Sequence, residues 1–236
     1  MNYTIHRTET SPPLDRWDDT SWQQADTLQV SSFHPRSSRH RPITEVKLLY
    51  DSDHLYIFFR VVDRYVTAIH TNYQAMVCND SCVESFIMPA IFRADTFLSP
   101  SPPRYQGYFN IEINCIGTML LYYIADWRRT ADGFEKYAPV PAELARGINI
   151  VSSLPTTPIE KEITSPLEWH IGYEIPFSIF EHYLGPLDFW RNRPWLGNFY
   201  KCGDQTSHPH WASWSPIGKQ LNFHQPESFG ILEFDN

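Results

Sequence analysis

Residues 45–63 read EVKLLYDSDHLYIFFRVVD, two apolar runs separated by Asp51, Ser52 and Asp53. Short polar residues at a bend between two apolar runs are typical of a β-hairpin, because Asp and Ser favour turns. The stretch therefore predicts two paired antiparallel strands. The rest of the chain repeats this pattern of short strands separated by turn residues.

Strand patterns continue towards the C-terminus. In residues 168–177, Trp169, Ile171, Tyr173 and Ile175 alternate with more polar residues, as expected of a strand with one wet face. Further strands are predicted over residues 81–90, over 108–126 with a turn at Gly117-Thr118, over 148–154, and over 228–234, which would close the sheet.

One short helix is predicted over residues 177–184. It begins after Pro176, and Gly185-Pro186 ends it. Because strands at this spacing predominate, the sequence predicts an all-β fold, a two-sheet antiparallel β-sandwich of jelly-roll type with one or two short helices. Residues 97–105 are interpreted as a loop between strands, so residues 1–236 are expected to form a single domain.

Composition excludes several classes of protein. The net charge of −8 disfavours nucleic-acid binding, and the basic run around Arg36, Arg39 and Arg41 is interpreted as a solvated loop. No segment has the roughly 20 apolar residues that cross a bilayer, and the N-terminus has no secretory signal pattern, so we expect a cytoplasmic protein unless a leader was removed. The four cysteines are expected to be buried free thiols.

Residues 195–234 combine tryptophans and histidines with proline-punctuated turns. Aromatic side chains at the ends of short strands stack on flat apolar ligand faces, including those of sugar rings. Polar neighbours can supply the directional hydrogen bonds that such a ligand needs, and they are Asn198, Asp204, His208 and His210. The stretch therefore predicts a binding surface.

The order of five motifs resembles the family 9-like carbohydrate-binding modules. The motifs are CNDSCVESFIMP (78–89), YFNIEINCIGT (108–118), EWHIGYEIPFSIF (168–180), WLGNFYKCGDQTSHPHWASWSPI (195–217) and NFHQPESFGILEF (222–234). The resemblance implies a β-sandwich that holds a mono- or oligosaccharide between aromatic side chains, in a stand-alone branch of the family. Some members also bind structural calcium, for which Asp15, Asp18 and Asp19 are the candidates here.

The resemblance also implies site residues. The family motif W-x-D-D-S-V-E aligns with residues 78–84, so that Glu84 would accept hydrogen bonds from sugar hydroxyls. Cys78 stands where the family motif has a tryptophan platform, and Tyr73, Trp211 or Trp214 could replace that platform from another direction. Three further residues occupy positions similar to the polar ligand-facing residues of the family, and they are Glu112, Asn114 and Asn198. His210 completes the set of candidate ligand-binding residues.

Each candidate has a structural alternative. Glu84 and Glu112 lie within apolar strands, where Arg60 and Lys201 are their candidate ion-pair partners. Four other tryptophans are interpreted as core or loop anchors, and they are Trp17, Trp22, Trp127 and Trp190. A transition-metal site could use Cys202, Asp204, His208 and His210, but the spacing matches no paired zinc motif.

Three functions remain open at this point. The first is non-catalytic carbohydrate binding, without nucleic acid or membrane as a partner and with no cofactor other than calcium. The second is a small carbohydrate-active enzyme in which Glu84 and Glu112 form a carboxylate pair. The third is a haem- or cofactor-binding sandwich with Met76, Met88 or Met119 as an axial ligand, although no CxxCH motif is present.

Overall fold

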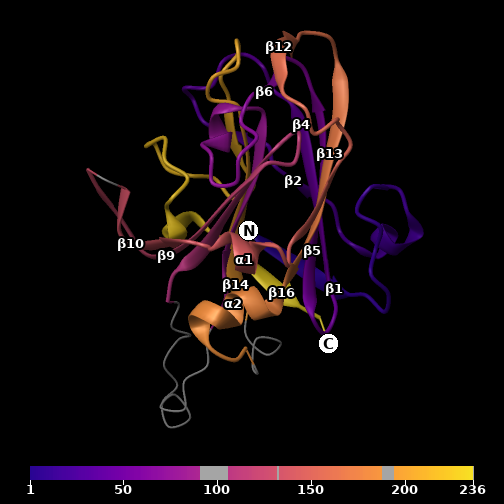
Figure 1. Ribbon diagram of the computed structural model, residues 1–236, viewed down its shortest axis with the longest axis vertical. Helices are drawn as coiled ribbons and strands as arrows, with labels where there is room; N and C mark the ends of the chain where they lie inside the picture. Colours follow the sequence, from indigo (N-terminus) through magenta and orange to yellow (C-terminus); the bar gives the residue numbers. More distant parts are fainter. Residues whose placement is uncertain (91–105, 132, 188–193, 236) are drawn as a thin grey trace.

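The computed structural model describes residues 1–90, 106–131, 133–187 and 194–235, whose strands form two packed sheets (Figure 1). The first sheet has the strand order β10 (Gly133–Pro139), β9 (Met119–Thr130), β8 (Tyr108–Asn114), β7 (Cys82–Met88), β14 (Trp195–Cys202) and β16 (Gly230–Phe234). Beside β14, β15 (Trp211–Ser213) connects it to β3 (Ser32–Phe33).

The second sheet has the order β4 (Ile43–Tyr50), β5 (His54–Asp63), β13 (Leu167–Pro176) and β11 (Asn149–Ser152), with β2 (Leu28–Gln29) against β4. A separate pair consists of β6 (Val66–Ala68) and β12 (Ile159–Ile163). The short helices are α1 (Ala142–Ala145) and α2 (Phe177–Leu184), and α2 lies at the lower end of the sandwich in Figure 1. Within the described residues, neither helix is long and apolar enough to span a membrane.

The predicted β-sandwich is confirmed, and so are most of its parts. The hairpin of β4 and β5 turns at residues 51–53, the turn between β8 and β9 contains Gly117, and α2 has the predicted bounds. The predicted loop over 97–105 and the anchor role of Trp190 lie outside the described residues.

The N-terminal strand was not predicted. In β1 (Asn2–Arg7), residues 2–5 pair in parallel with β16, and residues 6–7 pair in parallel with β4. This one strand therefore joins the two otherwise antiparallel sheets along one edge. Sequence patterning missed it because NYTIHR has only two buried apolar positions, Tyr3 and Ile5, and its partners are distant in sequence.

The core lies between the inner faces of the two sheets. Trp169 from β13 and Trp195 from β14 are fully buried there. A second apolar cluster covers the outer face of the second sheet, where Trp17 and Trp22 pack edge-on against Phe58. The anchor role predicted for these two tryptophans is confirmed, whereas Trp127 on β9 is 36% exposed.

A buried ion pair crosses the core between the sheets. The Lys201 ammonium of β14 lies 3.3 Å from the Asp63 carboxylate of β5, and neither side chain has any exposed surface. Lys201 also donates to the Cys202 carbonyl, and His40 lies 2.7 Å from the second Asp63 oxygen. A buried charge requires such partners, because desolvation costs several kcal/mol per ion.

The outer cluster depends on a glycine in β13. A Cβ atom on Gly172 would lie 2.1 Å from the Leu14 carbonyl oxygen, which belongs to the segment that carries Trp17 and Trp22. Because the obstacle is backbone, the segment must move away from the sheet if a side chain is added.

We expect Gly172→Ala to lower the free energy of unfolding by about 2–3 kcal/mol, as overpacking does. Urea unfolding of the two proteins measures the difference. Gly218→Ala is the matched control, because a Cβ there meets only the Gln225 side chain at 3.7 Å, and its stability should change by less than about 0.5 kcal/mol. Equal stability losses in the two variants would contradict the expected clash.

Candidate functional site

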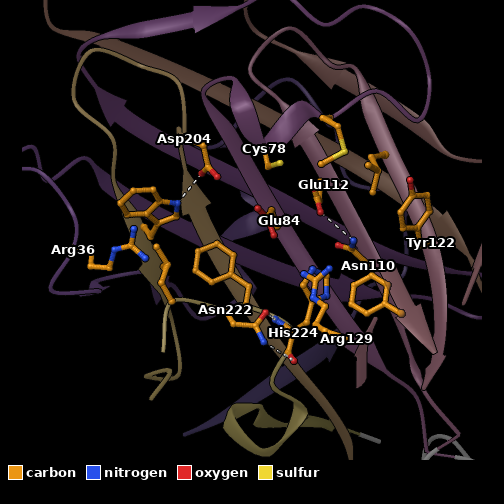
Figure 2. Close-up of a pocket in the computed structure, with 16 residues that line it drawn as sticks. Arg36, Cys78, Glu84, Asn110, Glu112, Tyr122, Arg129, Asp204, Asn222 and His224 are labelled. Atoms are coloured by element: carbon orange, nitrogen blue, oxygen red, sulfur yellow. Dashed lines mark hydrogen bonds between the residues drawn. The ribbon is translucent and has the colours of Figure 1, made fainter. Parts of the chain in front are cut away.

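A cavity of about 440 Å³ lies over the first sheet (Figure 2). Side chains alternate along a strand, and Val83 on β7 and Ile111 on β8 point into the core. Their neighbours Glu84 and Glu112 therefore point to the outer face, where the cavity is. The remaining lining comes from Arg36, Met76, Cys78, Asn110, Leu120, Tyr122, Arg129, Phe134, Asp204, Trp211, Leu221, Asn222, Phe223 and His224.

Two carboxyl groups form the floor of the cavity. Glu84 and Glu112 stand directly opposite each other on the antiparallel strands β7 and β8, and both are buried. Burial raises the pKa of both carboxyl groups, and for Glu84 the charge of Glu112 raises it further. The floor thus consists of two closely spaced oxygen acceptors that resist carrying two negative charges together.

Part of the hydrogen-bonding capacity of the floor is unused. Asn110 donates from Nδ2 to Glu112 Oε1 over 3.0 Å. Asn110 Oδ1 and Glu112 Oε2 are buried and have no hydrogen-bond partner within the described residues. Buried polar atoms in native proteins are nearly always paired, so these two acceptors indicate a place for a ligand or water that donates hydrogen bonds.

Trp211 and Phe223 form an aromatic wall on one side of the cavity. The Trp211 indole donates to Asp204 Oδ1 over 2.7 Å, which fixes the orientation of the ring. Phe223 stacks on Tyr200 at a ring distance of 4.1 Å, and the Tyr200 hydroxyl donates to the Phe223 carbonyl. The wall is therefore held by the sheet below it.

Tyr122 and Phe134 lie among the cavity residues from β9 and β10. The Arg129 guanidinium lies 4.1 Å from the centre of the Phe134 ring, so it brings a positive charge to the cavity. His224 packs against Phe134, and Figure 2 shows it beside Arg129 and Asn222, away from Tyr122. Aromatic rings above a floor of acceptors suit a ligand with apolar faces and polar edges.

The sequence model described as carbohydrate-binding family 9 matches residues 14–234. The chain belongs to carbohydrate-binding family 9. No curated protein sequence matches it. The family places the protein among non-catalytic binding modules, in agreement with the resemblance drawn from the sequence motifs.

Solved structures of the same fold cover nearly the whole chain. A Bacteroides uniformis protein that is proposed to bind carbohydrate is 24% identical, with a TM-score of 0.79 and 99% of each chain covered. A family 9 module from Caldicellulosiruptor kristjanssonii in complex with cellotriose is 11% identical, with a TM-score of 0.60 and coverage of 99% of this chain and 93% of that one. A family 9 module from the same organism in complex with glucose is 11% identical, with a TM-score of 0.56 and coverage of 98% of this chain and 95% of that one.

Within this family 9 chain, three of the predicted site residues line the cavity, namely Glu84, Glu112 and Trp211. Cys78, at the position of the family tryptophan, also lines it. The Trp211–Phe223 wall of the cavity is therefore built from β15 and the loop that precedes β16, whereas Cys78 lies in the helical turn before β7.

The two predicted asparagines bind backbone and core groups instead. Asn198 donates to the Ser215 carbonyl over 2.8 Å and accepts from the Ser215 and Phe199 amides. Asn114 donates to Asp80 Oδ2 over 2.8 Å and accepts from the Thr118 amide. The structure thus gives both side chains a full set of structural partners.

The other three predicted site residues also lie away from the cavity lining. The Tyr73 hydroxyl donates to the Val140 carbonyl, and Trp214 is buried in the main core. His210 is buried beside Lys201, whose ammonium lies 2.8 Å from His210 Nε2. Because His210 Nδ1 donates to the His208 carbonyl, Nε2 is free to accept from Lys201.

The predicted ion-pair partners of the two glutamates were wrong. Arg60 pairs with Glu45 and Glu168 on the second sheet. Lys201 pairs with Asp63 on the opposite side of the first sheet from Glu84. Within the described part of the chain, neither Glu84 nor Glu112 has a lysine or arginine partner at ion-pair distance.

The residues considered for a transition-metal site do not converge on one point in the described structure. Asp204 binds the Trp211 indole, His208 stacks on Tyr65 at 3.6 Å, and His210 is held by Lys201. Nothing in the described residues confirms calcium at its candidate residues Asp15, Asp18 and Asp19. Arg16 lies near the Asp15 and Asp19 carboxylates, at 3.6 and 3.7 Å, and Asp19 caps the Ser21 amide. The predicted axial methionines Met88 and Met119 are buried in apolar clusters, and Met76 is 54% exposed at the cavity.

Several cavity residues were missed by sequence reasoning. Asn110 and Tyr122 lie on the outer faces of predicted strands, and their alternation with buried apolar residues was the available signal. Phe223 and His224 lie in a quoted motif, but the motif does not show which of its aromatic residues would face the sheet. Arg129 and Phe134 carried no comparable signal.

Proposed function

We propose that the cavity over the first sheet is the carbohydrate-binding site of this family 9 protein. The ligand would be a mono- or oligosaccharide whose sugar ring lies between the Trp211–Phe223 wall and Tyr122. Its hydroxyl groups would donate to the carboxylate and amide oxygens of the floor. The binding is non-catalytic, as in the family.

The observation that carries this proposal is the pair of unpartnered buried acceptors, Asn110 Oδ1 and Glu112 Oε2. Sugar hydroxyls are donors, and two adjacent hydroxyls on one ring could satisfy two acceptors on one strand. The cavity volume of about 440 Å³ falls within the range of small-molecule sites. The family 9 structures with glucose and cellotriose make gluco-configured sugars the first ligands to try.

The alternative of a glycosidase is disfavoured by the family, whose members are non-catalytic binding modules. A retaining glycosidase would use Glu84 and Glu112 as a carboxylate pair, one ionised and one protonated. Absence of aryl-glycoside turnover at saturating protein would agree with the binding role.

The direct test is calorimetric titration of the protein with glucose and with cello-oligosaccharides. We expect saturable binding with a Kd in the micromolar to millimolar range, because the cavity is open on one side and the rings give one or two stacking faces. If no hexose, pentose or oligosaccharide of a broad panel gives a heat of binding, the cavity is not a sugar site.

We expect Glu112→Gln to weaken sugar binding about 10-fold, because the amide replaces one acceptor oxygen by a donor that opposes the sugar hydroxyl. The same change removes a buried carboxylate, so the melting temperature should not fall. Calorimetry and thermal unfolding of the one variant separate these effects.

Glu135→Gln is the matched control, because Glu135 is an exposed carboxylate on the edge strand β10 of the same sheet and does not line the cavity. Its sugar affinity should equal that of the wild type. An unchanged affinity in Glu112→Gln would place the sugar away from the floor.

A further inference from the structure

A pair of buried thiols lies beside the carboxylate floor, on the same outer face of the first sheet. Cys82 on β7 and Cys202 on β14 are directly opposite each other in the antiparallel pairing, and both are free thiols. Glu84 stands two residues after Cys82, so its side chain projects from the same face of the sheet. The three residues therefore converge from two neighbouring strands.

The donor atoms of these residues lie close enough to share one ion. The two Sγ atoms and a Glu84 carboxylate oxygen are all within 4.8 Å of one another, and Cys202 Sγ lies 3.1 Å from Glu84 Oε1. Tetrahedral zinc, with bonds of about 2.3 Å to sulfur and 2.0 Å to oxygen, requires ligand atoms about 3.3–3.8 Å apart. The Cys202–Glu84 distance of 3.1 Å is already close to that range, and the other two separations are no more than 4.8 Å.

The surroundings supply charge and access. Glu112 adds a second carboxylate beside Glu84, and neither has a lysine or arginine ion-pair partner in the described parts of the chain. Cys78 is half-buried, lines the cavity, and has its carbonyl 3.6 Å from Cys202 Sγ. Because Glu84 lines the cavity, an ion that enters the cavity can reach one of the three proposed ligands directly.

We propose that Cys82, Cys202 and Glu84 bind a thiophilic divalent cation of the zinc type beside the cavity. Two thiolates and one carboxylate select zinc or cobalt over calcium or magnesium, which prefer all-oxygen sites. Binding forms two metal–sulfur bonds and one metal–oxygen bond. The two thiol protons, and the carboxyl proton where Glu84 holds one, are released to solvent.

The test uses the reduced protein of residues 1–236 without sugar, so its outcome is separate from that of the proposed carbohydrate site. Cobalt(II) is the spectroscopic probe. We expect one equivalent to give thiolate-to-cobalt charge-transfer absorption and the intense visible bands of a tetrahedral ion. Stoichiometric zinc should bleach both, and calorimetry in two buffers should show release of at least two protons per zinc.

Cys202→Ala should lose the charge-transfer absorption and weaken zinc binding on the order of 100-fold or more, since one of three protein ligands is gone. Cys115→Ala is the matched control, because Cys115 is also a buried free thiol but belongs to the main core cluster. It should keep the wild-type spectrum.

The wild-type spectrum decides the proposal even where Cys202→Ala fails to fold. A protein with all four thiols reduced that gives only the weak bands of octahedral aqueous cobalt would overturn it. Loss of the signal in Cys115→Ala to the same extent as in Cys202→Ala would overturn it as well.

Discussion

Replacing Asp63 by Asn is expected to lower the free energy of unfolding by about 3–5 kcal/mol, because it leaves the Lys201 ammonium buried without its anionic partner. Lys201 has no exposed surface, so water cannot replace the carboxylate. The His40 contact at 2.7 Å and the Trp169 indole at 3.4 Å would then face a neutral amide. Urea unfolding of wild type and variant measures the loss.

The same pair sets a pH dependence. Burial alone would raise the pKa of Asp63, but Lys201 and His40 outweigh it and hold the pKa well below its ordinary value. The pair therefore stabilises the fold fully above the unfolded-state pKa of about 3.9, and this stability is lost as pH falls towards the folded-state pKa. We therefore expect the free energy of unfolding of Asp63→Asn to fall less than that of the wild type as the pH is lowered through this range.

Two further variants keep the Asp63 prediction decisive. Asp126→Asn breaks an exposed pair with Arg128, which water screens, so its stability loss should be much smaller than that of Asp63→Asn. The double variant Asp63→Asn with Lys201→Met removes both buried charges and should recover much of the lost stability. A loss in Asp63→Asn no larger than in Asp126→Asn would show that the core tolerates an unpaired Lys201.

Replacing Trp211 by Ala is expected to weaken sugar binding about 30-fold. Stacking on one indole face covers about 80 Å² of apolar surface, which at 25 cal/mol per Å² gives about 2 kcal/mol. Trp211 is half-buried at the cavity, and its indole is held by Asp204, so the ring is already oriented before a ligand binds. Calorimetric titration with the best sugar ligand measures the change.

Trp127→Ala is the matched control for Trp211. Trp127 is a partly exposed tryptophan on β9 that does not line the cavity, so its loss should leave sugar affinity unchanged. Equal weakening in both variants would indicate a ligand that extends over the outer surface of β9. Weakening only in Trp127→Ala would move the site away from the Trp211–Phe223 wall.

Local patterns in the sequence were enough to predict most of the sandwich. Apolar runs separated by turn residues predicted β4, β5, β8 and β9, alternation of apolar and polar residues predicted β13, and proline and glycine marked the ends of α2. These features depend on neighbours within a few residues, so one chain segment contains the whole signal. The strand β1 escaped because its partners lie at the C-terminus and in β4.

The site was predictable only in part, because polar residues on adjacent strands look alike in sequence. Glu84 and Glu112 face the cavity, whereas Asn114 and Asn198 satisfy buried backbone and core groups. Likewise, Trp211 lines the cavity and Trp214, three residues later, fills the core. The difference depends on which outer surfaces are covered by distant segments.

The sequence by itself determined the class of fold, the position of most strands and membership of carbohydrate-binding family 9, because each depends on residue order along the chain. Only the tertiary structure decided which side chains share the cavity. Its floor comes from β7 and β8, and its walls come from β9, β10, β15 and the loop before β16. The side chains of the floor come together because of strand register, which places Glu84 opposite Glu112 and Cys82 opposite Cys202.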